Sequence, residues 1–161
     1  MKVAVYPGSF DPITYGHMDI AKRALKVFDK LIILVSDNPN KQGLFDVNEK
    51  KELIELALED VKDSIEVHIS HNLTVKQTKN LGATHIVRGL RAVTDFEYEF
   101  QLTHANRVLD KSIDSIFFMT DNKYSFLSST TVKEIALFKG ELNTFVPKFV
   151  EDMIVKKIEN E

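Results

Sequence analysis

Residues 6–17 read Tyr-Pro-Gly-Ser-Phe-Asp-Pro-Ile-Thr-Tyr-Gly-His and join an apolar run, residues 3–5, to a segment with helical periodicity. Backbone N–H groups at a helix start are unpaired and carry partial positive charge, so they attract phosphate. Gly8 and Gly16 would let a ligand approach the backbone closely, and His17 would donate a hydrogen bond to an anion. The stretch is typical of a phosphate site, although an ordinary strand-to-helix connection with incidental Gly and Pro fits its spacing equally well.

The bulk composition limits the class of protein. With 161 residues, of which 43% are hydrophobic and 28% charged, the chain is predicted to form a single domain over residues 1–161. It contains no cysteine, which excludes disulfides, thiolate zinc sites and a cysteine nucleophile. Its net charge of −3 argues against a nucleic-acid surface. No apolar run approaches the ~18 residues of a membrane span, and the chain opens with a strand instead of a leader, so we expect a cytoplasmic protein without membrane partners.

Strand signals and helix signals alternate along the chain. The continuous apolar run of residues 31–35 is typical of a parallel strand covered on both faces. Asp46 and Glu49 have the spacing of a helix capping box, and Thr74 and Gln77 repeat it. The predicted strands span residues 2–6, 31–35, 65–70, 85–87 and 113–119, and the predicted helices span residues 18–28, 46–61, 74–81, 95–109, 128–138 and 148–158. This order predicts an α/β fold, a doubly wound, five-stranded parallel sheet with helices on both faces.

The segments that follow the predicted strands should meet at one edge of the sheet, because parallel strands place their carboxyl ends on the same side. These segments are the opening loop, the loop carrying Lys41, the turn at Leu73, residues 88–91 and residues 120–130. Ligands of doubly wound folds bind beyond that edge, near the point where the strand order reverses. The sequence therefore predicts one binding site built from these connections.

Three cationic side chains and two carboxylates lie in or near these segments. Arg88 and Arg91 flank a glycine at a strand end, where two guanidinium groups suit phosphate oxygens and surface ion pairs are the alternative. Lys41 would neutralise a phosphate or would be a solvated loop lysine. Glu97 and Glu99 would accept a hydrogen bond from a ribose hydroxyl, would bind a metal ion through water, or would lie on a solvated helix face.

The remaining motifs favour chemistry without a covalent intermediate. Residues 128–131, Ser-Ser-Thr-Thr, open a helix and offer hydroxyl and N–H groups to a second anion. The sequence shows no Ser–His–Asp arrangement, no metal-ligand spacing among its histidines, and neither GxxxxGK[ST] nor GxGxxG. Two phosphate-bearing substrates held in line would suffice for phosphoryl or nucleotidyl transfer, which depends on positioning and charge neutralisation.

Three blocks of the sequence resemble a known family. Residues 7–12, Pro-Gly-Ser-Phe-Asp-Pro, followed by Gly16-His17, resemble the signature of the nucleotidyltransferase superfamily with an HxGH-type motif. Residues 88–99, Arg-Gly-Leu-Arg-Ala-Val-Thr-Asp-Phe-Glu-Tyr-Glu, and residues 124–130, Tyr-Ser-Phe-Leu-Ser-Ser-Thr, narrow the resemblance to the bacterial phosphopantetheine adenylyltransferase family. That resemblance implies a Rossmann-like nucleotidyltransferase fold and reversible transfer of the adenylyl group of ATP to 4′-phosphopantetheine in coenzyme A biosynthesis. It also implies a homohexamer, and Mg²⁺ bound through the ATP phosphates with no protein metal ligand.

The resemblance further implies roles for single residues. The catalytic residues would be His17, which matches a transition-state stabiliser, with Lys41, Arg88 and Arg91. Phosphopantetheine would be bound by Ser9, Lys41, Leu73 and Arg88. ATP would be bound by Ser9, Phe10, His17, Gly89, Leu90, Arg91, Glu99, Tyr124, Ser125, Phe126, Leu127, Ser128, Ser129 and Thr130. Ser9 stands where the family often has Thr, which keeps a hydroxyl, and Tyr124 stands where Trp is common, which leaves the packing of its ring open.

Three alternatives compete with this interpretation. Another small nucleotidyltransferase, a cytidylyltransferase or a nicotinamide mononucleotide adenylyltransferase, would share the fold, but cytidylyltransferases carry Leu-Leu-His where this chain has Pro12-Ile13-Thr14. A non-catalytic nucleotide-binding module would have no reason to keep His17 together with the three cations. A flavodoxin-like electron carrier or a receiver domain would need a flavin loop or an acidic phosphoacceptor cluster, and neither is present in the sequence.

Overall fold

The sheet seen in the computed structural model, which describes residues 1–160, confirms the predicted fold class. Five parallel strands lie in the order β3-β2-β1-β4-β5. They are β1 (Val3–Gly8), β2 (Lys30–Ser36), β3 (Ile65–Ser70), β4 (His85–Leu90) and β5 (Asp114–Met119). Strand β1 pairs with β2 along its whole length but pairs in register with β4 at Ala4 and Val5. The strand order reverses between β1 and β4, so their carboxyl ends form the crevice in which doubly wound folds bind ligands.

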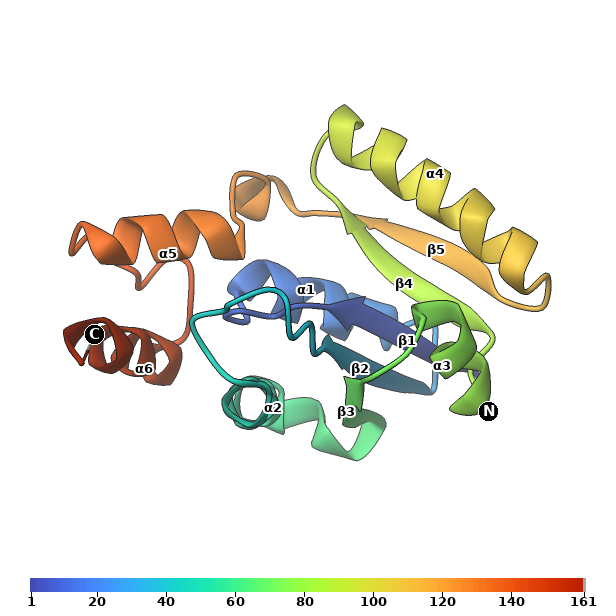
Figure 1. Cartoon of the computed structure of the whole chain (residues 1–161), viewed down its shortest axis with the longest axis horizontal. Helices are drawn as coiled ribbons and strands as arrows, with labels where there is room; N and C mark the ends of the chain where they lie inside the picture. The colour runs from blue at the N-terminus through green and yellow to red at the C-terminus, as the bar shows by residue number, and fades with distance from the viewer. Residues whose placement is uncertain (161) are drawn as a thin grey trace.

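Helices cover both faces of the sheet (Figure 1). They are α1 (Tyr15–Ala24), α2 (Val47–Ala57), α3 (Thr74–Asn80), α4 (Val93–Leu109), α5 (Ser129–Leu137) and α6 (Lys148–Glu159), with 3-10 turns η1 (Glu59–Ser64) and η2 (Asn122–Tyr124). Alternate residues of β1 face different cores: Ala4 and Tyr6 join the large core, while Val5 joins a smaller cluster with Ala83. Figure 1 shows α5 and α6 at the end of the molecule opposite the N-terminus. None of the helices in residues 1–160 combines the length and apolarity that crossing a membrane requires.

Helix α1 begins with a capping box whose third residue is a histidine. Thr14 Oγ1 accepts the backbone N–H of His17, and His17 Nδ1 accepts the backbone N–H of Thr14 at 3.0 Å. The predicted start at residue 18 is therefore three residues late. Capping boxes are recognised by Glu or Gln at this position, and the sequence has neither. The box holds the His17 ring at the first turn of α1 without help from a ligand.

Strand β4 is longer than the sequence indicates. The prediction ends it at Val87, whereas Arg88 and Gly89 pair in register with residues 117–118 of β5. The backbone of Arg88 is therefore part of the sheet and not of a loop. From this position its guanidinium donates to the carbonyl oxygen of Pro7 at 3.1 Å, which joins the carboxyl ends of β4 and β1.

The two predicted capping boxes of later helices have different outcomes. The box of α2 is confirmed, because Asp46 accepts the N–H of Glu49 and Glu49 accepts the N–H of Asp46, both at 2.9 Å. The box predicted at Thr74 is wrong. Leu73 is the N-cap residue of α3, and the side chain of Gln77 donates instead to a backbone carbonyl at the end of β3.

Candidate active site

The segments that follow β1, β4 and β5 enclose a cleft of about 490 Å³ at the point where the strand order reverses. The predicted site residues that line it are Ser9, Phe10, His17, Arg88, Gly89, Arg91, Glu99, Tyr124, Leu127, Ser128, Ser129 and Thr130. They come from the opening loop, the start of α1, β4 with α4, and the start of α5. The amino ends of both α1 and α5 reach the cleft, so the positive ends of two helix dipoles face an anion placed there.

The His17 ring lies in the wall of the cleft as a neutral hydrogen-bond donor. Its Nδ1 accepts the backbone N–H of Thr14, so the ring proton is on Nε2. Burial, reinforced by the charge of Arg91, lowers the pKa of His17 from 6.5 to about 4. The ring packs edge-on against Phe10, with 5.0 Å between ring centroids. At neutral pH His17 therefore presents an uncharged N–H group that is fixed in direction.

The opening loop turns at Phe10, whose φ of 45° lies in the left-handed region. Such a conformation costs about 1 kcal/mol or more for a non-glycine residue and requires support from its surroundings. The support is the ring itself, which is 2% exposed and packs between Tyr6 and His17. A Cβ on Gly8 would meet the Phe10 ring at 3.0 Å, so this glycine makes room for the ring. Gly8 also lines the cleft, where the sequence predicts close approach of a ligand. The anchored turn leaves Ser9 exposed in the cleft wall.

Arg88 is held by a carboxylate from α4. Its Nε and Nη2 donate to the two oxygens of Glu99 at 2.8 and 2.6 Å. The Glu99 side chain is 8% exposed, so the interpretation as a solvated helix face is wrong for Glu99, while Glu97 is exposed. Burial disfavours the charge of Arg88, but its hydrogen bonds to Glu99 outweigh this and raise the pKa of the guanidinium. Arg88 is therefore a charged group fixed in the cleft wall.

Arg91 lies three residues further along the chain in a more open setting. Its side chain is 41% exposed, and its Nε donates to Asp95 at 3.1 Å. Its Nη1 also donates to the backbone oxygen of Leu127 at 3.3 Å, which joins the end of β4 to the segment before α5. Arg91 therefore carries its charge at the rim of the cleft and Arg88 carries its charge at the wall.

The start of α5 is capped and tied to the opening loop. Ser128 Oγ accepts the backbone N–H of Thr131 at 3.1 Å, so ordinary capping explains Ser128. Ser129 Oγ donates to the carbonyl oxygen of Pro12 at 2.7 Å. Thr130 is exposed and lines the cleft. These bonds fix the amino end of α5 next to that of α1.

The packing of Tyr124, which the sequence left open, is a ring stack. Its ring lies 6.4 Å from that of Tyr15 at an interplanar angle of 26°. Lys123 lies over the Tyr124 ring at 4.9 Å. The aromatic side chain therefore stands at the mouth of the cleft, supported by the first residue of α1.

Three residues of the predicted ATP set do not line the cleft, namely Leu90, Ser125 and Phe126. Leu90 is buried, at 6% exposure, at the end of β4. Ser125 Oγ donates to a backbone carbonyl within the turn η2, and Phe126 is exposed and packs edge-on against Phe145. The side chains of these three residues have local packing or turn roles, and their contact with ATP stays a prediction.

A second cavity of about 120 Å³ adjoins the cleft and shares Pro7, Arg88 and Glu99 with it. Its remaining lining comes from α3, α4 and two strands and consists of Leu73, Thr74, Val75, Ile86, Leu102, Thr103, Asn106, Leu109 and Ser115. Leu73 and Arg88 are thus the predicted phosphopantetheine residues that line it. Leu102 and Asn106 were not predicted. They follow Glu99 at helical spacing on one face of α4, and that periodicity would have indicated them.

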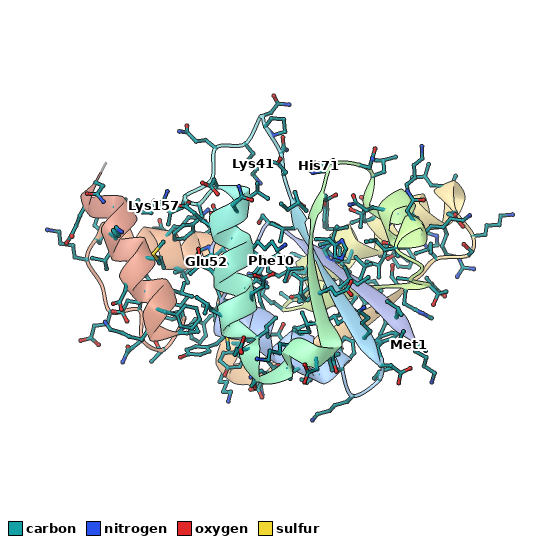
Figure 2. All side chains as sticks on the ribbon, turned by 90° about the horizontal axis from the view of Figure 1, so that it is seen from below. Met1, Phe10, Lys41, Glu52, His71 and Lys157 are labelled. Carbon is teal, nitrogen blue, oxygen red and sulfur yellow. The ribbon has the colours of Figure 1, made fainter. Side chains whose placement is uncertain are left out.

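Lys41 lines neither cavity. It is exposed on loop 37–43, which stands beyond the amino end of α2, whereas Phe10 lies in the interior of the molecule (Figure 2). The loop follows β2, next to β1 in the sheet, so it lies at the predicted edge. The structure places Lys41 at the correct edge of the sheet but not in contact with Arg88.

Comparisons with known protein sequences show which family the chain belongs to. The profile of the cytidylyltransferase-like family matches residues 5–135. A phosphopantetheine adenylyltransferase of Clostridium novyi (strain NT) is 49% identical, over 97% of this chain and 97% of the relative. A phosphopantetheine adenylyltransferase of Caldanaerobacter subterraneus subsp. tengcongensis is 48% identical, over 98% of both chains. The chain belongs to the phosphopantetheine adenylyltransferase family. Membership in that family confirms the resemblance drawn from the three sequence blocks and decides against the cytidylyltransferase and flavodoxin-like alternatives.

Solved structures share the fold of this phosphopantetheine adenylyltransferase chain at low identity. A Vibrio parahaemolyticus protein provisionally described as a nicotinate-nucleotide adenylyltransferase superimposes with a TM-score of 0.74 at 15% identity, covering 100% of this chain and 97% of that one. The nicotinic acid mononucleotide adenylyltransferase of Plasmodium falciparum in complex with NaAD gives a TM-score of 0.70 at 18% identity, covering 96% and 95%. This likeness confirms the nucleotidyltransferase fold.

Proposed function

We propose that the chain transfers the adenylyl group of ATP to 4′-phosphopantetheine, forming dephospho-coenzyme A and pyrophosphate in coenzyme A biosynthesis. The observation that carries the proposal is the junction of two cavities at Arg88 and Glu99. The larger cavity has polar lining residues and the amino ends of α1 and α5, which a nucleoside triphosphate needs. The smaller one has apolar walls with isolated polar groups, as the slender pantetheine arm requires.

In the larger cavity, the ends of α1 and α5 and the charge of Arg91 would bind the ATP phosphates. Tyr124 lines the same cavity, and Lys123 over its ring would add positive charge beside the nucleotide. The predicted ATP residues Ser9, Gly89 and Thr130 lie along the same walls. We infer that ATP lies with its α-phosphate near His17, because the ring lines this cavity and its Nε2–H is fixed in direction.

In the smaller cavity, Leu73, Leu102 and Asn106 would hold the pantetheine arm. Its phosphate would then lie at the junction, next to the guanidinium of Arg88. Lys41 would add a second positive charge from loop 37–43 once the acceptor is bound. Both cations are suited to a phosphate, Arg88 through its fixed fork and Lys41 as a point charge.

The reaction needs no nucleophile from the protein. An oxygen of the phosphopantetheine phosphate, already an anion at neutral pH, attacks the α-phosphorus of ATP. The bond to the β-phosphate breaks, and pyrophosphate leaves with its electron pair. His17 Nε2–H donates to an α-phosphate oxygen as negative charge builds on it, and a neutral imidazole performs this role without a proton transfer. Arg91 and the start of α5 stabilise the departing pyrophosphate.

We propose that Mg²⁺ enters with ATP and is held by its phosphates. Among residues 1–160, no three His, Asp or Glu side chains lie together as a metal site would require. Mg²⁺ typically keeps several waters and binds through substrate phosphates in such enzymes. The ion would neutralise charge on the leaving pyrophosphate, and the residues of this chain would position the phosphates around it.

We also propose a cytoplasmic homohexamer. Helix α4 leaves large apolar side chains exposed, among them Val93, Phe96, Phe100 and Val108, and exposed apolar side chains gathered on one element are typical of interfaces. A second copy would cover them. ATP, the proposed substrate of the chain, is a cytoplasmic metabolite, which supports the proposed cytoplasmic location. Light scattering should give six times the mass of 18.4 kDa, and a monomer would contradict the assembly.

The test of the function is a substrate panel. The chain should release pyrophosphate from ATP in the presence of Mg²⁺ and 4′-phosphopantetheine. It should release none above background when CTP replaces ATP, or when nicotinamide mononucleotide replaces the acceptor. Measurable ATP binding without pyrophosphate from any pair would support a non-catalytic binding module instead.

A further inference from the structure

The carboxylate of Asp11 is buried between three segments of the chain. Asp11 is 4% exposed, and its Oδ1 accepts the backbone N–H of Phe45 at 2.9 Å. Its Oδ2 accepts the backbone N–H of Leu44 at 2.9 Å and an N–H of Lys133 at 3.0 Å. Burial opposes its charge, but these hydrogen bonds outweigh burial and lower the pKa of Asp11 below 3.8. Asp11 is therefore an ionised group whose two oxygens are both used.

The base of loop 37–43 sits directly on this carboxylate. A Cβ on Gly43 would lie 2.9 Å from Asp11 Oδ2, so the loop backbone touches the carboxylate with no room for a side chain. Lys41 lies two residues before Gly43, a span of at most ~7 Å. Other hydrogen bonds of the loop join Asn40 and Lys41 to Asn38 within the loop itself. The position of Lys41 relative to the cleft therefore depends on the contact between the base of loop 37–43 and the carboxylate of Asp11.

Asp11 also connects this loop with the ATP side of the site. It follows Phe10 in the opening loop, and Lys133 lies one helical turn beyond Ser129 in α5. Ser129 donates to the carbonyl oxygen of Pro12, the residue after Asp11. The bond of Ser129 holds the start of α5 to the opening loop independently of the carboxylate, so the ATP side of the site keeps this bond when Asp11 is replaced.

We propose that Asp11 is a positioning residue for the acceptor substrate: its carboxylate anchors the base of loop 37–43 and so keeps Lys41 within reach of the phosphate of phosphopantetheine. This inference rests on the proposed function, because it assigns Lys41 to that phosphate. Asp11 itself touches neither substrate. Its removal should weaken capture of the acceptor and leave ATP binding and the chemical step almost unchanged.

The first test is the kinetics of Asp11→Asn in the full-length protein. We expect the KM for 4′-phosphopantetheine to rise about tenfold or more, with the KM for ATP and kcat within about twofold of wild type. Gly43→Ala approaches the same contact from the loop side and should give the same selective change while keeping Asp11. In the Lys41→Ala background, Asp11→Asn should add almost nothing, because both changes remove the same interaction. Asp46→Ala, which removes the neighbouring cap of α2, is the control and should lower the melting temperature without a selective change in either KM.

A second measurement does not depend on activity. Trypsin should cleave after Lys41 about tenfold faster in Asp11→Asn and Gly43→Ala than in wild type or Asp46→Ala, as followed by mass spectrometry. Equal rises in both KM values, full additivity with Lys41→Ala, or an unchanged cleavage rate would overturn the role of Asp11. If wild type releases no pyrophosphate, the proposed function fails, and the cleavage rates still report whether Asp11 anchors the loop.

Discussion

The site has two halves that differ in how firmly their side chains are held. In the fixed half, which consists of His17, Arg88 and Glu99, each side chain is bound by another part of the protein before a ligand arrives. In the exposed half, which is loop 37–43, Lys41 extends from a segment anchored at its base. Groups that meet transition-state charge act best when they are preorganised. We therefore expect the fixed half to govern kcat and the exposed half to govern capture of the acceptor.

Among the residues of the fixed half, replacing His17 should have the largest effect on catalysis. His17→Ala should lower kcat by at least ~100-fold, which corresponds to about 2.7 kcal/mol or more of transition-state stabilisation, because it removes the Nε2–H donor. The measurement is steady-state pyrophosphate release.

A matched variant separates catalysis from helix capping. His17→Gln puts a residue at the third helical position that can complete the capping box with Thr14, so its melting temperature should stay near that of wild type. Its kcat should fall as far as that of His17→Ala. Turnover within a few-fold of wild type in either variant would contradict the role of His17.

Replacing Arg88 and replacing Arg91 should change the free energy of unfolding by different amounts. Arg88→Met leaves the buried carboxylate of Glu99 without its partner and should lower the free energy of unfolding by about 3 kcal/mol. Arg91→Met removes a half-exposed ion pair and should change it by less than about 0.5 kcal/mol. Chemical denaturation measures both, and the double variant Arg88→Met/Glu99→Gln should recover part of the loss. Equal losses of unfolding free energy in Arg88→Met and Arg91→Met would show that the wall and the rim of the cleft hold their arginines equally firmly.

Removing Lys41 should affect the exposed half alone. Lys41→Ala should raise the KM for 4′-phosphopantetheine about tenfold while kcat stays within a few-fold and the melting temperature does not change, because the side chain is exposed. Lys62→Ala is the control. It also removes one positive charge, which belongs to an exposed ion pair with Glu59 outside loop 37–43. If kcat falls as it does for His17 variants, then Lys41 belongs to the catalytic half.

His17 should also affect the pH dependence of stability. The folded-state pKa of His17 is about 4 and its ordinary value is 6.5, so between these pH values the unfolded chain binds a proton that the folded chain does not. The free energy of unfolding should therefore decrease as the pH falls through this window, and the contribution of His17 should be complete above pH 6.5. Melting temperatures at pH 7 and pH 5 should differ less in His17→Gln than in wild type. Identical differences would mean that His17 is not held neutral.

Local patterns were sufficient to predict the fold. The continuous apolar run within β2 and the alternation of strand and helix signals gave the five parallel strands, because these signals depend on residues close in sequence. Two local details were predicted wrongly because a side chain took an unusual partner, namely the start of α1 and the capping box at Thr74. His17 completes the cap of α1, and Gln77 bonds to β3 instead of its own helix start.

The partners within the site could not be predicted in the same way. The resemblance named Arg88 and Glu99, but only the folded chain brings them into one ion pair across 11 residues. The partners of Asp11 carry no signal in the sequence, because Leu44 and Phe45 lie 33 and 34 residues away and contribute backbone groups, which every residue type has. Contacts of this kind depend on the packing of loops and not on local periodicity.

The central claim, that this site joins the adenylyl group of ATP to the phosphate of phosphopantetheine, is tested most directly by phosphorus-31 NMR of the reaction with Mg²⁺. The account predicts that the phosphomonoester signal of 4′-phosphopantetheine disappears while the paired signals of a new diphosphate ester and the signal of pyrophosphate grow in equal amounts. Pyrophosphate formed together with AMP while the phosphomonoester signal stays unchanged would contradict it.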